Sequence, residues 1–303
     1  MNAARTSVRR REHGVERACV IDAALLKRWS LPDPRTCSSK EDRGRVLVIG
    51  GSVEVPGAVL LAGIGALRAG AGKLQIATAA AAAMPLAIAV PEAKVIGLTS
   101  NARGAIRGLG RDGLQAVRHA GAVLVGPGMD ATLATRRVAR MVVGAAPGTI
   151  VMDAGALDIA VVRAASRRGN AAQCVLTPHP GEMAALLDMD EAAVSAEPAR
   201  IARECASRWG VILVLKGATT HIAAPDGRMW VNRAGSIGLG TSGSGDVLAG
   251  LVTGLAARGA SPEQAAVWGV HLHAKAGARL SRRLGLIGFL AREISDEVPE
   301  LMP

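Results

Sequence analysis

A glycine-rich stretch that leads to an acidic residue carries the clearest chemical signal in this chain. Five glycines stand between residues 235 and 245, and they keep side chains away from the backbone. Apolar residues then follow with the spacing of a helix that buries one stripe, at Val247, Leu248, Leu251, Val252 and Leu255. The loop therefore opens into a helix N-terminus, where free amides and the helix dipole favour phosphate and other anions.

Asp246 stands at the mouth of this loop. A carboxylate has the wrong charge for holding phosphate, so we interpret Asp246 as a general base that acts on a hydroxyl group beside it. The structural alternative is an N-cap aspartate after a flexible turn. The elements around the loop have to decide between these two interpretations.

Continuous apolar runs recur along the chain, and each ends in glycine or polar residues. This pattern is typical of parallel strands that are covered on both faces, with ligands at their carboxyl ends. The sequence therefore predicts an α/β fold with a central, mostly parallel sheet flanked by helices on both faces. The runs are 45–49, 122–125, 149–152, 174–176 and 211–215, and residues 221–224 and 229–232 form a predicted β-hairpin around a Pro-Asp-Gly turn.

Composition narrows the class of protein. The 303 residues are 50% hydrophobic but only 2% aromatic, and the net charge is +11. Five arginines crowd residues 1–17, which we predict to be a disordered basic tail ahead of a single domain over 18–303. No aromatic residues alternate with these arginines, so we expect no nucleic-acid partner. The run from Leu74 to Pro91 is too weakly hydrophobic for a membrane span, and we interpret it as a buried strand and a packed helix.

Other motifs are weaker. The four cysteines form no CxxC pair, which favours a reducing cytoplasm over a zinc site or a disulfide framework. Gly70-Ala71-Gly72-Lys73 suggests a P-loop, but Leu67 and Leu74 stand where that motif needs glycine and a hydroxyl residue. His271 and His273 lack a third nearby metal ligand, so we interpret them as part of a helix face.

Taken in order, these pieces resemble the ADP/ATP-dependent NAD(P)H-hydrate dehydratase family, which has a ribokinase-like fold. The resemblance covers roughly residues 40–299, and the order of its motifs is more specific than any one of them. The motifs are residues 44–52, Pro56-Gly57-Ala58, residues 67–72, Gly126-Pro127-Gly128, residues 153–157, Thr177-Pro178-His179-Pro180-Gly181-Glu182, Lys216-Gly217 and Gly243-Ser244-Gly245-Asp246.

The resemblance implies an activity. The family repairs NADHX and NADPHX, the hydrated forms of the reduced nicotinamide nucleotides, by phosphorylating the added hydroxyl and then eliminating phosphate. It implies Asp246 as the catalytic base and Gly243, Ser244 and Gly245 as an anion hole. By the same resemblance, Ala58, Gly128, His179 and Asp246 contact the hydrated nicotinamide, and Lys216, Gly217, Ala218, Thr219, Thr220 and Gly245 contact the nucleotide.

Cofactors and partners follow from the same comparison. ADP, or ATP, is the expected phosphoryl donor, with ADP preferred as in bacterial members. Glu182 stands where related sugar kinases place a glutamate that organises Mg²⁺ through water. Asp153 is expected to shape a strand-to-helix turn. We also expect a homo-oligomer and a separate epimerase that interconverts the substrate epimers, because the epimerase domain often fused upstream has no counterpart here.

Two positions depart from the family pattern. Ser236 replaces an asparagine before the loop, and Ser242 replaces a glycine within it. The shorter side chain at 236 and the added Cβ at 242 are expected to affect rate or substrate fit, since the backbone at 242 could require a positive φ.

Two alternatives stay open at this point. One is a small-molecule kinase of the same fold, of the hydroxyethylthiazole or hydroxymethylpyrimidine type. The segment Thr177-Pro178-His179-Pro180-Gly181-Glu182 disfavours it, because those kinases usually carry asparagine in that segment. The other is a nucleotide-sensing protein without catalysis, which the presence of Gly245 and Asp246 disfavours.

Overall fold

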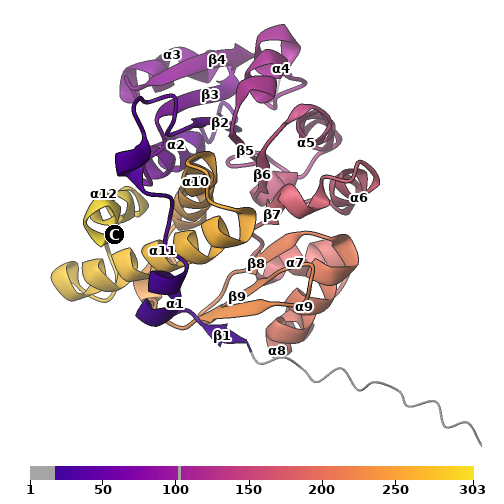
Figure 1. The fold of residues 1–303 in the computed structure, drawn as a ribbon. Coiled ribbons are helices and arrows are strands. Elements are labelled where there is room, and N and C mark those ends of the chain that lie inside the picture. Colours follow the sequence, from indigo (N-terminus) through magenta and orange to yellow (C-terminus); the bar gives the residue numbers. More distant parts are fainter. Residues whose placement is uncertain (1–17, 102–103) are drawn as a thin grey trace, which may run out of the picture.

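A single ten-stranded sheet runs through the computed structural model, which describes residues 18–101 and 104–303 (Figure 1). The strand order is β1-β10-β9-β8-β7-β6-β5-β2-β3-β4. Only β9 pairs antiparallel with its two neighbours, β8 and β10, and the other pairs are parallel. The strands are β1 Cys19–Val20, β2 Arg45–Ile49, β3 Lys73–Ala79, β4 Ala93–Leu98, β5 Ala122–Val125, β6 Thr149–Met152, β7 Cys174–Leu176, β8 Ile212–Leu215, β9 Thr220–Ala223 and β10 Met229–Asn232.

Helices cover both faces of this sheet (Figure 1), as the sequence predicts for the α/β class. On one face pack α1 Ala23–Arg28, α2 Gly57–Arg68, α3 Ala80–Ala89, α10 Ser244–Ala257, α11 Pro262–Leu284 and α12 Ala291–Leu301. On the other pack α4 Gly110–His119, α5 Leu133–Ala145, α6 Ile159–Arg167, α7 Pro180–Leu187, α8 Glu191–Ala196 and α9 Pro198–Trp209. The described residues also contain four 3₁₀ turns: η1 Pro34–Thr36, η2 Ala154–Ala156, η3 Ala171–Gln173 and η4 Ile237–Leu239.

Strand β2 shows why the apolar runs are continuous. Val46 and Val48 join the core on the α10 side, whereas Leu47 and Ile49 join the core on the α5 side. All four side chains have no exposed surface. Successive residues of a strand point to opposite faces, so a strand buried on both faces needs apolar residues at every position. The prediction of two-sided burial is confirmed.

Helix α10 lies deeper than its sequence pattern suggests. The prediction of one buried stripe was wrong, because every residue from Val247 to Ala256 is buried. Small residues permit this burial: a Cβ at Gly250 would lie 2.1 Å from the backbone oxygen of Ala62 in α2. A Cβ at Gly254 would lie 2.5 Å from the oxygen of Ala66, one turn farther along α2. The two helices are therefore parallel, and their N-termini lie at the same end.

Several local predictions can be compared directly. The hairpin is confirmed as β9 and β10, and the segment from Leu74 forms β3 and α3. The short strand β1 and the edge strand β4 were not predicted, because two residues or a half-exposed strand give little periodic signal. Among the described residues, no helix combines the length and the apolar character that crossing a membrane requires. The predicted disordered tail, 1–17, lies outside the described residues.

Candidate active site

The loop before α10 places backbone amides at the end of a buried helix. Gly243 is the N-cap and has φ +86°, a left-handed conformation that glycine adopts without strain. Within the described residues, the amides of Gly243 and Gly245 donate no hydrogen bond, whereas Ser244 N donates to Thr241 O at 3.2 Å. Of the three amides in the predicted anion hole, the Ser244 amide is therefore used within the loop, and the free amides of Gly243 and Gly245 at a helix N-terminus suit an oxyanion.

Asp246 lies in the first turn of α10, three residues after the N-cap. The alternative interpretation as an N-cap aspartate was wrong, because Gly243 occupies that position and no capping bond from Asp246 is present in the described residues. Burial and the Asp153 and Glu182 carboxylates together raise the pKa of Asp246 to about 7, against the opposing charge of Lys216. A carboxyl group with this pKa can accept and release a proton near neutral pH.

Lys216 connects the predicted nucleotide segment to α10. Its Nζ lies 3.0 Å from Asp153 Oδ1 and 3.6 Å from Glu182 Oε2. A Cβ at Gly245 would lie 3.3 Å from the same Nζ, so the ammonium group stands over the first turn of α10. Burial alone would lower the pKa of Lys216, but the carboxylates of Asp153, Glu182 and Asp246 together raise it above its ordinary value. Lys216 therefore stays charged and directed at the anion site.

Asp153 is the site residue that sequence reasoning underestimated. Its side chain is buried, 3% exposed, and Oδ1 accepts hydrogen bonds from Thr177 Oγ1 at 2.7 Å and Lys216 Nζ at 3.0 Å. It does stand at the strand-to-helix turn, as predicted, but its carboxylate also fixes the lysine. Its place just after β6 was an available signal, because Lys216 follows β8 at the same edge of the sheet.

His179 caps α7. Its Nδ1 accepts from the amides of Gly181 and Glu182 at 3.1 and 3.3 Å, and Glu182 Oε2 accepts from the His179 amide at 2.7 Å. This reciprocal capping box fixes the ring. Because Nδ1 is an acceptor, the neutral ring carries its proton on Nε2. The half-exposed side chain can therefore offer an Nε2 donor to a ligand.

Ala58 and Gly128 form another part of the same end of the sheet. Gly128 follows β5 with φ +64°, and a Cβ there would lie 2.9 Å from the Ala58 Cβ and 2.6 Å from Val55 O. Ala58 is in the first turn of α2, and Gly243 before α10 approaches Leu61 one turn later in α2. The two N-termini are thus neighbours, and a side chain at 128 would collide with Ala58 and Val55.

The predicted nucleotide segment forms the turn between β8 and β9. Gly217 and Ala218 are exposed, Thr219 is partly exposed, and the Thr220 hydroxyl donates to Gly217 O at 3.4 Å. Among the described residues, Lys216 is the member of this segment whose side chain pairs with Asp153 and Glu182 beside α10. The rest of the turn presents backbone to solvent beside that lysine, so its nucleotide contacts stay a prediction.

The two departures from the family pattern have local explanations. The positive φ of the loop falls at Gly243, and outside the glycines the described residues have positive φ only at Ala154 and Asp188. The concern about Ser242 was therefore wrong, since its backbone is not in the left-handed region. The Ser236 hydroxyl donates to Gly277 O at 3.2 Å, which fixes the start of the loop to α11.

His273 was interpreted as part of a helix face, and it proves to contact the anion loop. Its Nε2 lies 2.9 Å from Ser244 Oγ and 3.0 Å from Ser244 O. Burial lowers the pKa of His273 to about 4, so the ring is neutral at physiological pH. The sequence pattern His-x-His was visible, but nothing in it indicated a contact 29 residues away.

The side chains near the anion site limit how a metal ion could be bound. The described residues contain no group of three or more His, Cys, Asp or Glu side chains placed to hold an ion. Asp153 Oδ1 and Glu182 Oε2 pair with Lys216 Nζ, so the second carboxylate oxygen of each residue is outside these ion pairs. Mg²⁺ usually keeps several waters and takes one or two carboxylates together with substrate phosphates. The carboxylates of Glu182 and Asp153 are compatible with Mg²⁺ held in this way, and the role of Glu182 stays a prediction.

Comparison with known proteins shows the family to which this chain belongs. A model of the NAD(P)H-hydrate dehydratase family matches residues 46–300. The chain belongs to this family. A relative from Xanthomonas campestris pv. campestris, called ADP-dependent (S)-NAD(P)H-hydrate dehydratase, is 50% identical over 94% of this chain and 96% of its own. A Bacillus subtilis relative with the same description is 32% identical over 90% and 94% of the two chains.

Solved structures and longer relatives were compared with this member of the dehydratase family. The ADP/ATP-dependent NAD(P)H-hydrate dehydratase of Bacillus subtilis, co-crystallised with ATP and Mg²⁺, has TM-score 0.77 and 28% identity, covering 94% of this chain and 98% of its own. A hydroxyethylthiazole kinase from Pyrococcus horikoshii, at TM-score 0.58 and 19% identity, shares the fold alone. A bifunctional repair enzyme from Moorella thermoacetica is 36% identical over 91% of this chain but only 52% of its own length. The ribokinase-like fold is confirmed.

Proposed function

We propose that this protein is a nucleotide-dependent dehydratase that converts (S)-NADHX and (S)-NADPHX to NADH and NADPH. The observation that supports this most directly is the first turn of α10, where a buried carboxyl group with a pKa near 7 stands beside free amides and a charged lysine. The relative that is half identical over nearly the whole chain is described as a dehydratase of this kind. A small-molecule kinase would use the same base and amides, so the likeness to this relative, rather than the site, favours the dehydratase.

The chemistry divides into two steps. Hydroxide is a poor leaving group at neutral pH, whereas phosphate leaves readily. Asp246 accepts the proton of the added hydroxyl while the hydroxyl oxygen attacks the terminal phosphorus of the nucleotide, whose phosphoanhydride bond breaks. The carbon–oxygen bond of the new ester then breaks and phosphate departs with the bonding electrons. A proton on the adjacent ring carbon passes to water, and the electrons of that carbon–hydrogen bond restore the double bond.

The chain's other groups have supporting roles in this scheme. The amides of Gly243 and Gly245 face the charge that develops on the transferred phosphoryl group. Lys216 contacts the nucleotide phosphates, together with the backbone of residues 217–220. Ala58, Gly128 and His179 line the hydrated nicotinamide, with His179 donating from Nε2. When bound, Mg²⁺ would neutralise phosphate charge, held through water by Glu182.

The defining experiment is a stoichiometric assay. We expect one phosphoanhydride consumed and one inorganic phosphate released for each nicotinamide restored, followed by reduced-nicotinamide absorbance and phosphate release in one reaction. ADP is expected to support a higher kcat/KM than ATP. A non-hydrolysable nucleotide should bind without repair, and full-rate repair with the analogue, or with no nucleotide, would replace phosphorylation by direct acid–base dehydration.

The pH profile tests the base. Because Asp246 must be ionised to accept a proton and its pKa is about 7 in the free protein, kcat/KM should rise with pH and level off above about 7. The slope of log(kcat/KM) below the midpoint should be close to one, since a single group titrates. A profile already flat from pH 5 upward would mean that the base has an ordinary carboxyl pKa.

Replacing Lys216 separates the two ligands. We expect Lys216→Ala to weaken nucleotide binding by about tenfold or more, because a charge-assisted contact to phosphate is lost, and to leave binding of the hydrated nicotinamide much less affected. Calorimetric titration of each ligand measures this. Lys275→Ala, which removes an exposed lysine from α11, is the control. Equal losses for both ligands would make Lys216 a structural residue.

The setting of the enzyme is also part of the proposal. We propose a cytoplasmic protein whose residues 18–303 fold as a single domain and associate as a homo-oligomer. A separate epimerase would supply the (S) form of the substrate. This chain spans about half the length of the bifunctional repair relatives. Their description as bifunctional supports a second activity on the same metabolite.

A further inference from the structure

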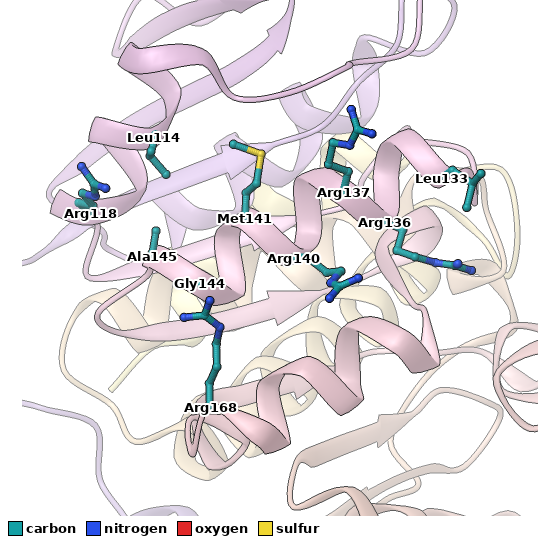
Figure 2. Close-up of a pocket in the computed structure, with 10 residues that line it drawn as sticks. All are labelled: Leu114, Arg118, Leu133, Arg136, Arg137, Arg140, Met141, Gly144, Ala145 and Arg168. Carbon is teal, nitrogen blue, oxygen red and sulfur yellow. The ribbon is translucent and has the colours of Figure 1, made fainter.

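A cationic groove of about 740 Å³ lies between α4, α5 and the C-terminal end of α6. Figure 2 shows its side chains, with Arg136 and Arg140 extending from α5 and Arg168 rising from the end of α6 towards Gly144. None of the residues assigned to the candidate active site lines it. The lining residues are Leu114, Arg118, Leu133, Arg136, Arg137, Arg140, Met141, Gly144, Ala145 and Arg168.

The charge of this groove is one-sided. Five of its ten lining residues are arginines and none is acidic. Arg136 forms an ion pair with Asp158 at 2.6 Å. Within the described part of the chain, the side chains of Arg118, Arg137, Arg140 and Arg168 form no ion pair. Four unpaired guanidinium groups around one depression repel one another, and a ligand of high negative charge would relieve that repulsion.

Gly144 contributes to the shape of the groove. A Cβ at this position would lie 3.5 Å from Arg168 Cζ, so the guanidinium group rests against the backbone of α5. Gly144 lies inside that helix, where glycine is unfavourable compared with alanine. The contact holds Arg168 beside the α5 arginines and brings charge from two helices to one place.

We propose that this groove binds a small ligand with a chain of two or more phosphate groups, either free or attached to a nucleoside. The planar guanidinium fork pairs with phosphate through two hydrogen bonds, and several forks can engage successive phosphates. The volume lies within the range of small-ligand sites. Leu114 and Met141 add an apolar wall at the α4 side. This site is independent of the catalytic assignment.

Inorganic tripolyphosphate is the probe. We expect calorimetric titration of the full chain to show a site that the double variant Arg137→Gln/Arg140→Gln loses, or binds about tenfold or more weakly, as expected when charge-assisted contacts are removed. The matched control is Arg28→Gln/Arg282→Gln, which removes the same charge from exposed positions on α1 and α11. The control should bind as the parent does, and dehydratase turnover should be unchanged within about twofold in both variants. Arg118→Gln, from α4, should also weaken the site, and it serves if the double variant folds poorly.

The same proteins distinguish the sources of the phosphates. A larger loss for ATP than for tripolyphosphate in the groove variant identifies a nucleoside-borne ligand, and equal losses identify the phosphate chain alone. Equal binding by all three proteins, or equal losses in both double variants, overturns the proposal. It is also overturned if a single-stranded RNA of 10 to about 20 nucleotides binds the arginines more tightly than tripolyphosphate, or if the groove variant changes only the sedimentation of the protein.

Discussion

Replacement of Asp246 by asparagine is expected to lower kcat by about 100-fold or more, with nucleotide affinity close to that of the parent. Asparagine keeps the size of the side chain but cannot accept the proton of the hydroxyl, and a positioned general base contributes about 10²- to 10⁴-fold. The free amides of Gly243 and Gly245 stay in place, because neither depends on the carboxylate. Steady-state repair of the hydrated nucleotide and calorimetry with ADP measure the two quantities.

Stability provides a second readout for the same variant. The pKa of Asp246 is raised to about 7 in the folded protein from an ordinary value of 3.8. For an acid with a raised pKa, the native state binds the proton more tightly, so native stability falls as pH rises from about 4 to about 7. The Asp246→Asn variant has no carboxyl group at this position, so its stability does not fall in this way as the pH rises. Its Tm should therefore exceed that of the parent by more at pH 8 than at pH 5.

Asp226→Asn is the matched control, since this carboxylate lies in the β9–β10 turn and pairs with Arg228. It should leave turnover unchanged within about twofold. Near-parental turnover of Asp246→Asn would remove this residue from the mechanism. A Tm difference that does not depend on pH would mean that the carboxyl group is not desolvated as the structure indicates.

The second large effect concerns stability and follows from the contact between α2 and α10. Gly250→Ala is expected to destabilise the fold by about 3 kcal/mol, the upper part of the range for overpacking. The new Cβ would lie 2.1 Å from the backbone oxygen of Ala62, and a backbone atom cannot move aside as a side chain can. Because α10 is buried on every side, the helix has no direction in which to retreat. Urea unfolding followed by circular dichroism measures the change.

Gly144→Ala is the control for this substitution. It also replaces a glycine inside a helix, but the new Cβ would meet only the Arg168 side chain at 3.5 Å, an ordinary contact. Alanine is the better helix former, so this variant should be as stable as the parent or up to about 1 kcal/mol more stable. If the two variants had the same unfolding free energy, the close approach of α2 and α10 would be absent in solution.

The sheet could be predicted from the sequence because its signal is local. A strand buried on both faces must be apolar at every position, and residues 46–49 or 212–215 show this without reference to any neighbour. The depth of α10 could not be predicted in the same way. Its stripe of Val247, Leu251 and Leu255 was visible, but the glycines and alanines between them are compatible with solvent as well as with close helix packing.

The candidate active site likewise has a part that is local in sequence and a part that depends on distant contacts. The glycine loop and Asp246 are adjacent in sequence, so their chemistry was readable. The contacts of Asp153 and His273 join residues 63 and 29 positions apart, and no spacing rule connects them. The net charge of +11 was also visible, and the sequence interpretation assigned the excess in part to residues 1–17. The groove on α5 shows that part of it gathers on the folded surface.

The capping box of α7 links the binding of the nucleotide to the binding of the hydrated nicotinamide. Glu182 Oε2 accepts from the His179 amide and also lies 3.6 Å from Lys216 Nζ, so one carboxylate oxygen joins the two proposed ligand sites. A nucleotide that draws Lys216 towards phosphate changes the charge that Glu182 balances at the start of α7. Coupling free energy is reciprocal: whatever factor the nucleotide imposes on the affinity for hydrated nicotinamide, the nicotinamide imposes on the nucleotide.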